Sequence, residues 1–194
     1  MKLKLIKKNE LKVSSWSGGT TTQLAIYPES AIYAEKNFQF RISTATVEVK
    51  ESDFTKLTGV SRKLMILNGT LKLEHLDRYT KTLNKFDIDT FEGDWQTKSF
   101  GRVTDFNLMT TGDTSGEIKG LSIKEGLVFD EILFTTYDIF TLYNFKGNIK
   151  ININEVHLDM NTGDVLILKK EKSGAEINIK AIKDCELAIT KIKL

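Results

Sequence analysis

Apolar and polar residues alternate along almost the whole chain, in short runs separated by glycine-rich or polar turns. Successive side chains of a strand point to opposite faces, so this alternation predicts strands that bury one face. Phe38–Val49 and Gly101–Thr110 are prominent runs in the first half. No stretch keeps a sustained helical period. The pattern therefore predicts an all-β protein.

The run Gly101–Thr110 carries an unusual polar face. Asp105, Asn107 and Met109 share one side of the predicted strand, and Phe106 and Leu108 share the other. A carboxylate and a carboxamide between large apolar neighbours indicate either a solvated edge strand or the wall of a polar pocket. The strand alone leaves both readings open.

Two arginines on predicted strands favour the pocket. Arg41 shares a face with Ser43 and Ala45, and this face is small and apolar enough to be buried. A buried guanidinium needs an anionic partner, for which Asp105 or a ligand carboxylate is the natural candidate. In the alternative reading, Arg41 lies at the strand end and extends to water.

Arg62 follows a segment predicted as a short helical turn, residues 52–59, and precedes a strongly apolar strand at residues 64–67. Trp16 precedes the pair Gly18-Gly19, which permits positive backbone angles or the close approach of another group. A tight turn with a packed tryptophan is the ordinary reading of this pair. A loop whose amides face a ligand is the functional one.

The second half repeats the first in outline. Gly69-Thr70-Leu71-Lys72-Leu73 resembles Gly147-Asn148-Ile149-Lys150-Ile151, and Gly93-Asp94 resembles Gly163-Asp164. Matching signatures in each half predict two related β-units. Gly112–Gly116 has the composition of a linker and marks their boundary. The second-half strands are expected at Glu131–Phe134, Ile139–Asn144, Ile149–Ile153, Val165–Leu168, Ile177–Ile182 and Leu187–Ile192.

Composition describes an ordinary globular chain. Of 194 residues, 40% are hydrophobic and eleven are phenylalanine, which suffices for a sizeable core. The 28 basic and 26 acidic residues leave a formal charge of +2 without a basic stripe, so nucleic acid is a poor partner. Cys185 is the single cysteine and fits a reducing compartment. Neither a signal peptide nor a membrane-spanning run is recognisable, so we expect a cytoplasmic protein.

Most catalytic chemistries find no support. His75 and His157 are the only histidines, and they are too far apart for the two-histidine strand motif of a metal-binding cupin. We therefore expect no metal and no cofactor. The chain also contains neither a nucleophile elbow nor a phosphate-binding loop. Binding is better supported than catalysis, because arginines with a carboxamide suit a small carboxylate.

Four blocks resemble the HutD/Ves family in order and spacing, over roughly residues 16–110. The blocks are Trp16-Ser17-Gly18-Gly19-Thr20-Thr21, Phe40-Arg41-Ile42-Ser43-x-Ala45, Phe54-x-x-Leu57-x-Gly59-Val60-x-Arg62 and Gly101-x-x-x-Asp105-Phe106-Asn107-Leu108-Met109. The resemblance implies a bicupin, in which two small cupin-like (jelly-roll) β-barrels pack in one chain without the cupin metal ligands. It also implies a regulatory role in histidine utilisation, with a formylglutamate- or urocanate-like ligand.

These expectations combine into one hypothesis. Residues 1–112 form a barrel with a ligand pocket, and residues 117–194 form a second barrel. The pocket binds a small carboxylate through Trp16, Gly18, Gly19, Arg41, Ser43, Arg62, Asp105 and Asn107. The alternatives are a metal-free isomerase or hydrolase with Asp105 as proton acceptor, and a protein–protein module with a vestigial pocket. No membrane partner is expected, and the sequence leaves a homodimer open.

Overall fold

A computed structural model describes residues 1–133, 135–171 and 175–194. The protein is all-β, as the alternating pattern predicted: nineteen strands and two short 3-10 helices, η1 (Lys8–Glu10) and η2 (Tyr33–Glu35), make up the described secondary structure. The predicted strand end at Phe134 lies outside the described residues. No helix in the described ranges is long and apolar enough to cross a membrane.

The chain forms two compact units. The first barrel comprises Lys12–Ser115, and the second barrel comprises Met1–Leu11 together with Gly116–Leu194. The observed boundary lies within the predicted linker. The predicted assignment of residues 1–112 to one barrel was wrong for the first eleven, which belong to the second.

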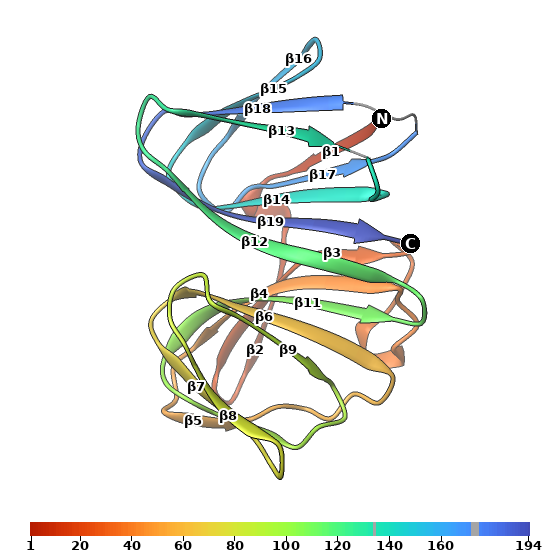
Figure 1. Ribbon diagram of the computed structural model, residues 1–194, viewed down its shortest axis with the longest axis vertical. Helices are drawn as coiled ribbons and strands as arrows, with labels where there is room; N and C mark the ends of the chain where they lie inside the picture. Colours follow the sequence, from red (N-terminus) through yellow and green to blue (C-terminus); the bar gives the residue numbers. More distant parts are fainter. Residues whose placement is uncertain (134, 172–174) are drawn as a thin grey trace. The chain divides into compact units, whose positions relative to one another are not determined.

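The first barrel consists of a six-stranded sheet that faces a four-stranded one (Figure 1). The larger sheet has the order β2 (Lys12–Trp16), β3 (Gly19–Tyr27), β4 (Phe40–Val47), β11 (Val103–Thr111), β6 (Val60–Asn68), β9 (Ile88–Glu92). The smaller has the order β5 (Glu51–Asp53), β10 (Thr97–Phe100), β7 (Leu71–His75), β8 (Tyr79–Leu83). The helical turn predicted at residues 52–59 is instead the end of β5, an irregular segment and a turn at residues 58–59.

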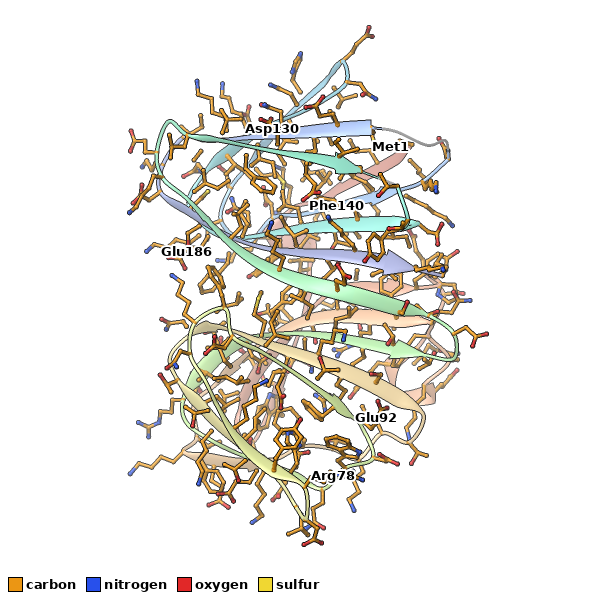
Figure 2. All side chains as sticks on the ribbon, viewed as in Figure 1. Met1, Arg78, Glu92, Asp130, Phe140 and Glu186 are labelled. Atoms are coloured by element: carbon orange, nitrogen blue, oxygen red, sulfur yellow. The ribbon has the colours of Figure 1, made fainter. Side chains whose placement is uncertain are left out.

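The second barrel has the same plan. Its five-stranded sheet has the order β1 (Lys2–Ile6), β17 (Val165–Lys169), β14 (Ile139–Lys146), β19 (Cys185–Lys193), β12 (Ser115–Ile123). Its four-stranded sheet has the order β13 (Val128–Leu133), β18 (Ala175–Ala181), β15 (Ile149–Ile153), β16 (Val156–Met160). An apolar core fills the space between these sheets, and Phe140, labelled in Figure 2, belongs to it.

The strand orders establish the internal duplication. Adding eight to the strand numbers in β4-β11-β6-β9 and β5-β10-β7-β8 gives the neighbour orders found in the second barrel. Gly69 and Gly147, which the sequence matched, occupy equivalent turns before β7 and β15, with φ of 89° and 92°. A Cβ at Gly69 would lie 2.7 Å from the Arg102 carbonyl oxygen, and one at Gly147 would lie 2.5 Å from that of Asp184. Both turns therefore require glycine for the same two reasons.

The second predicted match, Gly93-Asp94 with Gly163-Asp164, was wrong. The structural counterpart of Gly163 is Phe86, since both have positive φ and donate a backbone hydrogen bond to β6 or β14. In each turn an aspartate accepts from a backbone N–H three residues earlier: Asp87 Oδ2 lies 2.9 Å from the Asn84 nitrogen, and Asp164 Oδ2 lies 3.0 Å from that of Asn161. Because phenylalanine replaces glycine in the first copy, sequence similarity does not reveal the repeat at this turn.

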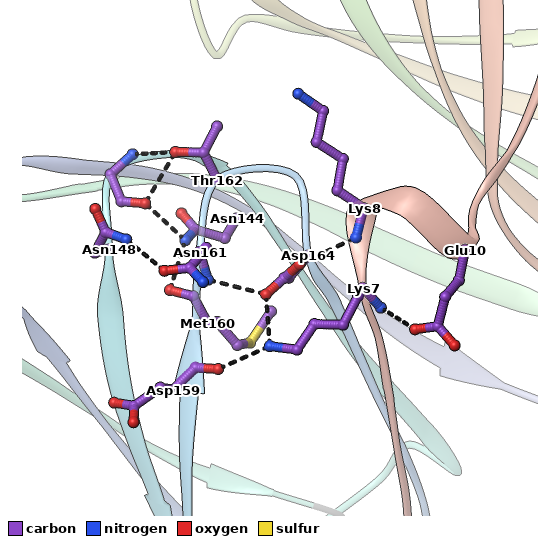
Figure 3. Close-up of polar contacts among 11 residues, drawn as sticks. Lys7, Lys8, Glu10, Asn144, Asn148, Asp159, Met160, Asn161, Thr162 and Asp164 are labelled. Atoms are coloured by element: carbon purple, nitrogen blue, oxygen red, sulfur yellow. Dashed lines mark hydrogen bonds and ion pairs between the residues drawn. The ribbon is translucent and has the colours of Figure 1, made fainter.

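The N-terminal segment joins the second barrel through β1 and one buried carboxylate. Strand β1 pairs antiparallel with β17 over five residues, from Lys2 opposite Lys169 to Ile6 opposite Val165. Beyond β1, the buried Asp164 accepts from Lys7 Nζ at 2.9 Å and from the Lys8 backbone N–H at 3.1 Å (Figure 3). The partners are more than 150 residues apart in the sequence. A division of the chain at one point therefore assigns residues 1–11 to the wrong barrel.

Candidate functional site

Three adjacent strands of the first barrel bring the predicted polar residues together. The register of β4, β11 and β6 places Arg41 and Arg62 on either side of Met109. Two residues before Met109 on β11, Asn107 lies opposite Ser43. Two residues before Asn107, Asp105 lies opposite Ala45. Since alternate residues of a strand share a face, this polar set lines one side of the sheet, as the alternation predicted.

This face bounds a cavity of about 340 Å³. Six of the eight predicted site residues line it, namely Trp16, Arg41, Ser43, Arg62, Asp105 and Asn107. Both sheets of the first barrel contribute to the walls, with Ser52, Leu71 and Ser99 from the smaller one. The volume suits a small metabolite.

Gly18 and Gly19 do not line the cavity, so the structure gives them a packing function. A Cβ at Gly18 would lie 2.0 Å from the Trp16 ring, and one at Gly19 would lie 1.9 Å from the Thr46 carbonyl oxygen. The first glycine lets the indole fold back over its own turn, and the second lets β3 begin against β4. Trp16 itself is 41% exposed and forms part of the cavity wall.

Arg41 is buried and held by neutral groups. Its Nε donates to Gln23 Oε1 at 3.0 Å, and its Nη1 donates to Ser43 Oγ at 3.1 Å. The guanidinium carbon lies 4.1 Å from the centre of the Tyr33 ring, which is a cation–π contact. Burial lowers the pKa of Arg41, and the nearby Tyr33 raises it. The described residues contain no ion pair between Arg41 and Asp105, so that predicted pairing was wrong.

Arg62 is more deeply buried and incompletely hydrogen bonded. Its guanidinium carbon lies 4.6 Å from the centre of the Phe54 ring and 5.4 Å from that of Phe91. Burial lowers its pKa to about 10, against the smaller raising effects of Tyr33 and Asp105, so the group stays cationic at neutral pH. Among the described residues, none accepts a hydrogen bond from the buried Nε. An unsatisfied buried donor is costly unless a ligand completes it.

Asp105 is the buried carboxyl group of the cavity. Burial raises its pKa to about 7, while Arg62 and a hydrogen bond from the Ala45 backbone N–H lower it. The nearby guanidinium therefore belongs to Arg62, not Arg41. Two residues along, the buried Asn107 Oδ1 has no hydrogen-bond partner within the described part of the chain. Two residues of the cavity lining, Arg62 and Asn107, thus each hold one buried polar atom without a partner among the described residues.

Sequence reasoning missed three side chains around these arginines. Tyr33 lies on η2 inside an irregular segment, where no periodicity indicates a direction. Phe54 was assigned to a helical turn, although its ring covers Arg62. Gln23 follows the threonine run and is Arg41's partner. The sequence does not single out this set, since Phe38 and Phe40 lie closer to Arg41 along the chain than Tyr33 does.

The second barrel shows that this polar set is not a requirement of the fold. With Ile66 and Asn144 at equivalent positions, the register assigns Phe140 to the position of Arg62, Leu187 to that of Asp105 and Ile189 to that of Asn107. All three belong to the apolar core of the second barrel. The same architecture is therefore stable with hydrocarbon at these positions, so the polar groups of the first barrel need another explanation.

The two histidines do not form a metal centre. Among the described residues, no group of three or more His, Cys, Asp or Glu could hold a metal ion. His75 is buried, with Nε2 at 2.9 Å from Asp89 Oδ2 and Nδ1 at 2.8 Å from Thr97 Oγ1. His157 lies on the surface, with Nδ1 at 2.7 Å from Asn152 Oδ1.

Known structures share this architecture. The conserved protein of unknown function PA5104 from Pseudomonas aeruginosa PAO1 superposes with a TM-score of 0.85 at 16% identity, covering 100% of both chains. HutD from Pseudomonas fluorescens SBW25 superposes with a TM-score of 0.72 at 16% identity, over 99% of this chain and 98% of that one. YhhW from Escherichia coli superposes with a TM-score of 0.73 at 12% identity, over 98% and 97%.

These likenesses, together with an oxalate decarboxylase from Lactobacillus farciminis (TM-score 0.69, 10% identity, 97% and 85% coverage), identify the fold as a bicupin. No curated protein sequence matches the chain. The sequence model of the HutD family matches residues 8–189, which span both barrels. The chain therefore belongs to the HutD family.

Proposed function

We propose that this chain is a cytoplasmic binding protein that takes a small carboxylate into the cavity of the first barrel, without a metal, and serves a regulatory role in histidine utilisation. A formylglutamate- or urocanate-like metabolite is the ligand that this role and the cavity favour. The single observation that carries the proposal is the buried cation Arg62, which lines the cavity and whose Nε has no acceptor among the described residues.

A carboxylate fits this arrangement in charge and geometry. A guanidinium donates two parallel hydrogen bonds to a carboxylate, and here Arg62 and Arg41 lie on either side of Met109. Asn107 Oδ1 supplies an acceptor for a ligand N–H, such as that of a formamide or an imidazole. The P. fluorescens HutD structure is of a formate condition, and formate is the smallest carboxylate.

Calorimetric titration with urocanate and with N-formyl-L-glutamate tests the proposal. We expect Arg62→Ala to weaken binding by about 10- to 100-fold, the value of a charge-assisted hydrogen-bond pair, and Arg62→Lys to recover part of the loss. Arg78→Ala is the matched control, because Arg78 is exposed and packs on Trp95 away from the cavity lining. Equal affinities of Arg62→Ala and the wild type would remove Arg62 from the site.

One observation favours a second candidate, a metal-free isomerase or hydrolase with Asp105 as proton acceptor. Its pKa of about 7 suits a general base at neutral pH. Nuclear magnetic resonance of each acid after prolonged incubation with the protein distinguishes the candidates. Product formation that Asp105→Asn abolishes would establish the enzyme, and unchanged ligand would leave the binding function.

A further inference from the structure

The cavity of the first barrel holds an unequal number of buried charges. Arg41 and Arg62 are 7% and 5% exposed, and Asp105 is 6% exposed. With Asp105 ionised these groups sum to one positive charge, and with Asp105 protonated they sum to two. The remaining titratable groups of the lining are Tyr33 on η2 and the exposed Asp53 on β5; no lysine or histidine lines the cavity.

The other wall elements bring no titratable group to Asp105. Ser14 and Trp16 of β2, Thr21 of β3, Leu71 of β7 and Ser99 of β10 are uncharged. On β11 itself the neighbours on the same face are Val103 and Asn107. The net charge of the buried site therefore depends on two arginines, one aspartate and the ligand.

Burying net charge is costly, so a bound state in which the charges cancel is strongly favoured. A ligand with one carboxylate cancels them with Asp105 ionised. A ligand with two carboxylates cancels them only if Asp105 carries a proton. A pKa of about 7 for Asp105 means that either state is accessible near neutral pH.

We propose that the cavity takes up one proton on Asp105 when it binds a dicarboxylate, and none when it binds a monocarboxylate. The proton comes from solvent and adds to a carboxylate oxygen of Asp105; no other bond changes. This inference rests on the proposed function, since it describes how the same cavity distinguishes acids by charge. The protein would then bind dicarboxylates better in acidic than in alkaline solution.

The experiment uses two ligands of one shape. N-formyl-L-glutamate and N-formyl-L-glutamine differ by one charge, because a carboxamide replaces the side-chain carboxylate. Calorimetry at pH 8 in buffers with different ionisation enthalpies counts the protons taken up on binding. We expect about one proton for N-formyl-L-glutamate and none for N-formyl-L-glutamine, and a dicarboxylate affinity that falls about tenfold per pH unit above 8.

Asp105→Asn is the decisive variant, because it keeps the shape and removes the titration. It should bind the dicarboxylate at pH 8 without proton uptake and more tightly than the wild type. Asp113→Asn, which removes an exposed carboxylate from the turn after β11, should retain the uptake. Binding of both acids by the wild type with no uptake, or uptake that persists in Asp105→Asn, would overturn the inference and leave the proposed function intact. If the wild type binds neither acid, both fall.

Discussion

At the scale of single residues, the site is defined by groups that the fold leaves uncompensated. Among the described residues, no hydroxyl or ammonium group donates to the Asp105 carboxyl, which is held by the Ala45 backbone N–H near Arg62. Arg62 compensates it only in part, since burial still raises the pKa of the carboxyl to about 7. Such groups destabilise the empty protein, which is typical of positions retained for binding.

The raised pKa of Asp105 predicts how the stability of the folded protein depends on pH. In the unfolded chain Asp105 titrates near its ordinary pKa of 3.8, and in the folded chain near 7. Between these values the folded state binds more protons, so stability falls as pH rises, by on the order of 4 kcal/mol at most. Asp105→Asn should remove this loss, so we expect the variant to gain stability over the wild type between pH 5 and pH 8.

Chemical denaturation of both proteins at pH 5, 6, 7 and 8 measures the difference in the free energy of unfolding. Asp113→Asn again serves as control, with a difference that stays flat over this range. A constant difference for Asp105→Asn would mean that the carboxyl is ionised throughout and paired more strongly than the structure indicates.

His75 illustrates a residue whose role the sequence did not indicate. It is one of two histidines in the sequence, and its ring lies between Asp89 and Thr97 from two later strands. Tyr79 donates to the same Asp89 at 3.2 Å, and burial with the nearby carboxylate raises the pKa of that phenol to about 12. The cluster is a packed polar network of the first barrel, because neither His75 nor Asp89 lines the cavity.

At the scale of elements, alternation along the chain predicted which residues share a face, but not which strands are neighbours. The shared face of Asp105, Asn107 and Met109 follows from period two alone, and the structure confirms it. The partner of Arg41 depends on strand order. Strand β11 lies between β4 and β6, and both arginines lie opposite Met109. Asp105 is four residues from Met109 along β11. Of the two arginines, Arg62 is the one whose charge lowers the pKa of Asp105.

The repeated turns give a prediction that separates backbone strain from close packing. Gly147 and Gly126 both have positive φ, 92° and 80°, so alanine is strained at both. Only at Gly147 would the new Cβ collide, with the Asp184 carbonyl oxygen at 2.5 Å, whereas Gly126 faces open space. We expect Gly147→Ala to cost about 1–3 kcal/mol more than Gly126→Ala, measured by denaturation. Equal costs would mean that the turn before β15 can shift away from β19.

At the scale of the whole molecule, the sequence predicted two related barrels but not their full membership. The strand-for-strand repeat covers eight strands in each, and the remaining three are additions: β2 and β3 in the first barrel and β1 in the second. No local pattern predicts that β1 pairs with β17, because strand pairing over this separation depends on contacts such as Lys7 with Asp164. The candidate pocket was predicted in the first half, because the strand-borne arginines and the polar face of residues 101–110 all lie there.

The duplication allows the cost of the site to be measured. Replacing three members of the polar set by their counterparts, as Arg62→Phe, Asp105→Leu and Asn107→Ile together, removes the buried pair of Arg62 and Asp105 and leaves Arg41 with its neutral partners. We expect the triple variant to be more stable than the wild type by on the order of 1–4 kcal/mol at pH 8, and to lose carboxylate binding.

Denaturation and calorimetric titration of the triple variant check both expectations, with the single Arg62→Phe variant beside it. Arg62→Phe should be less stable than the triple variant, because it leaves the buried Asp105 carboxylate without the guanidinium that lowers its pKa. A triple variant less stable than the wild type would contradict the comparison, because the polar set would then support the first barrel itself. Higher stability with lost binding would mean that one copy of a duplicated barrel kept its apolar core while the other gave up stability for a ligand site.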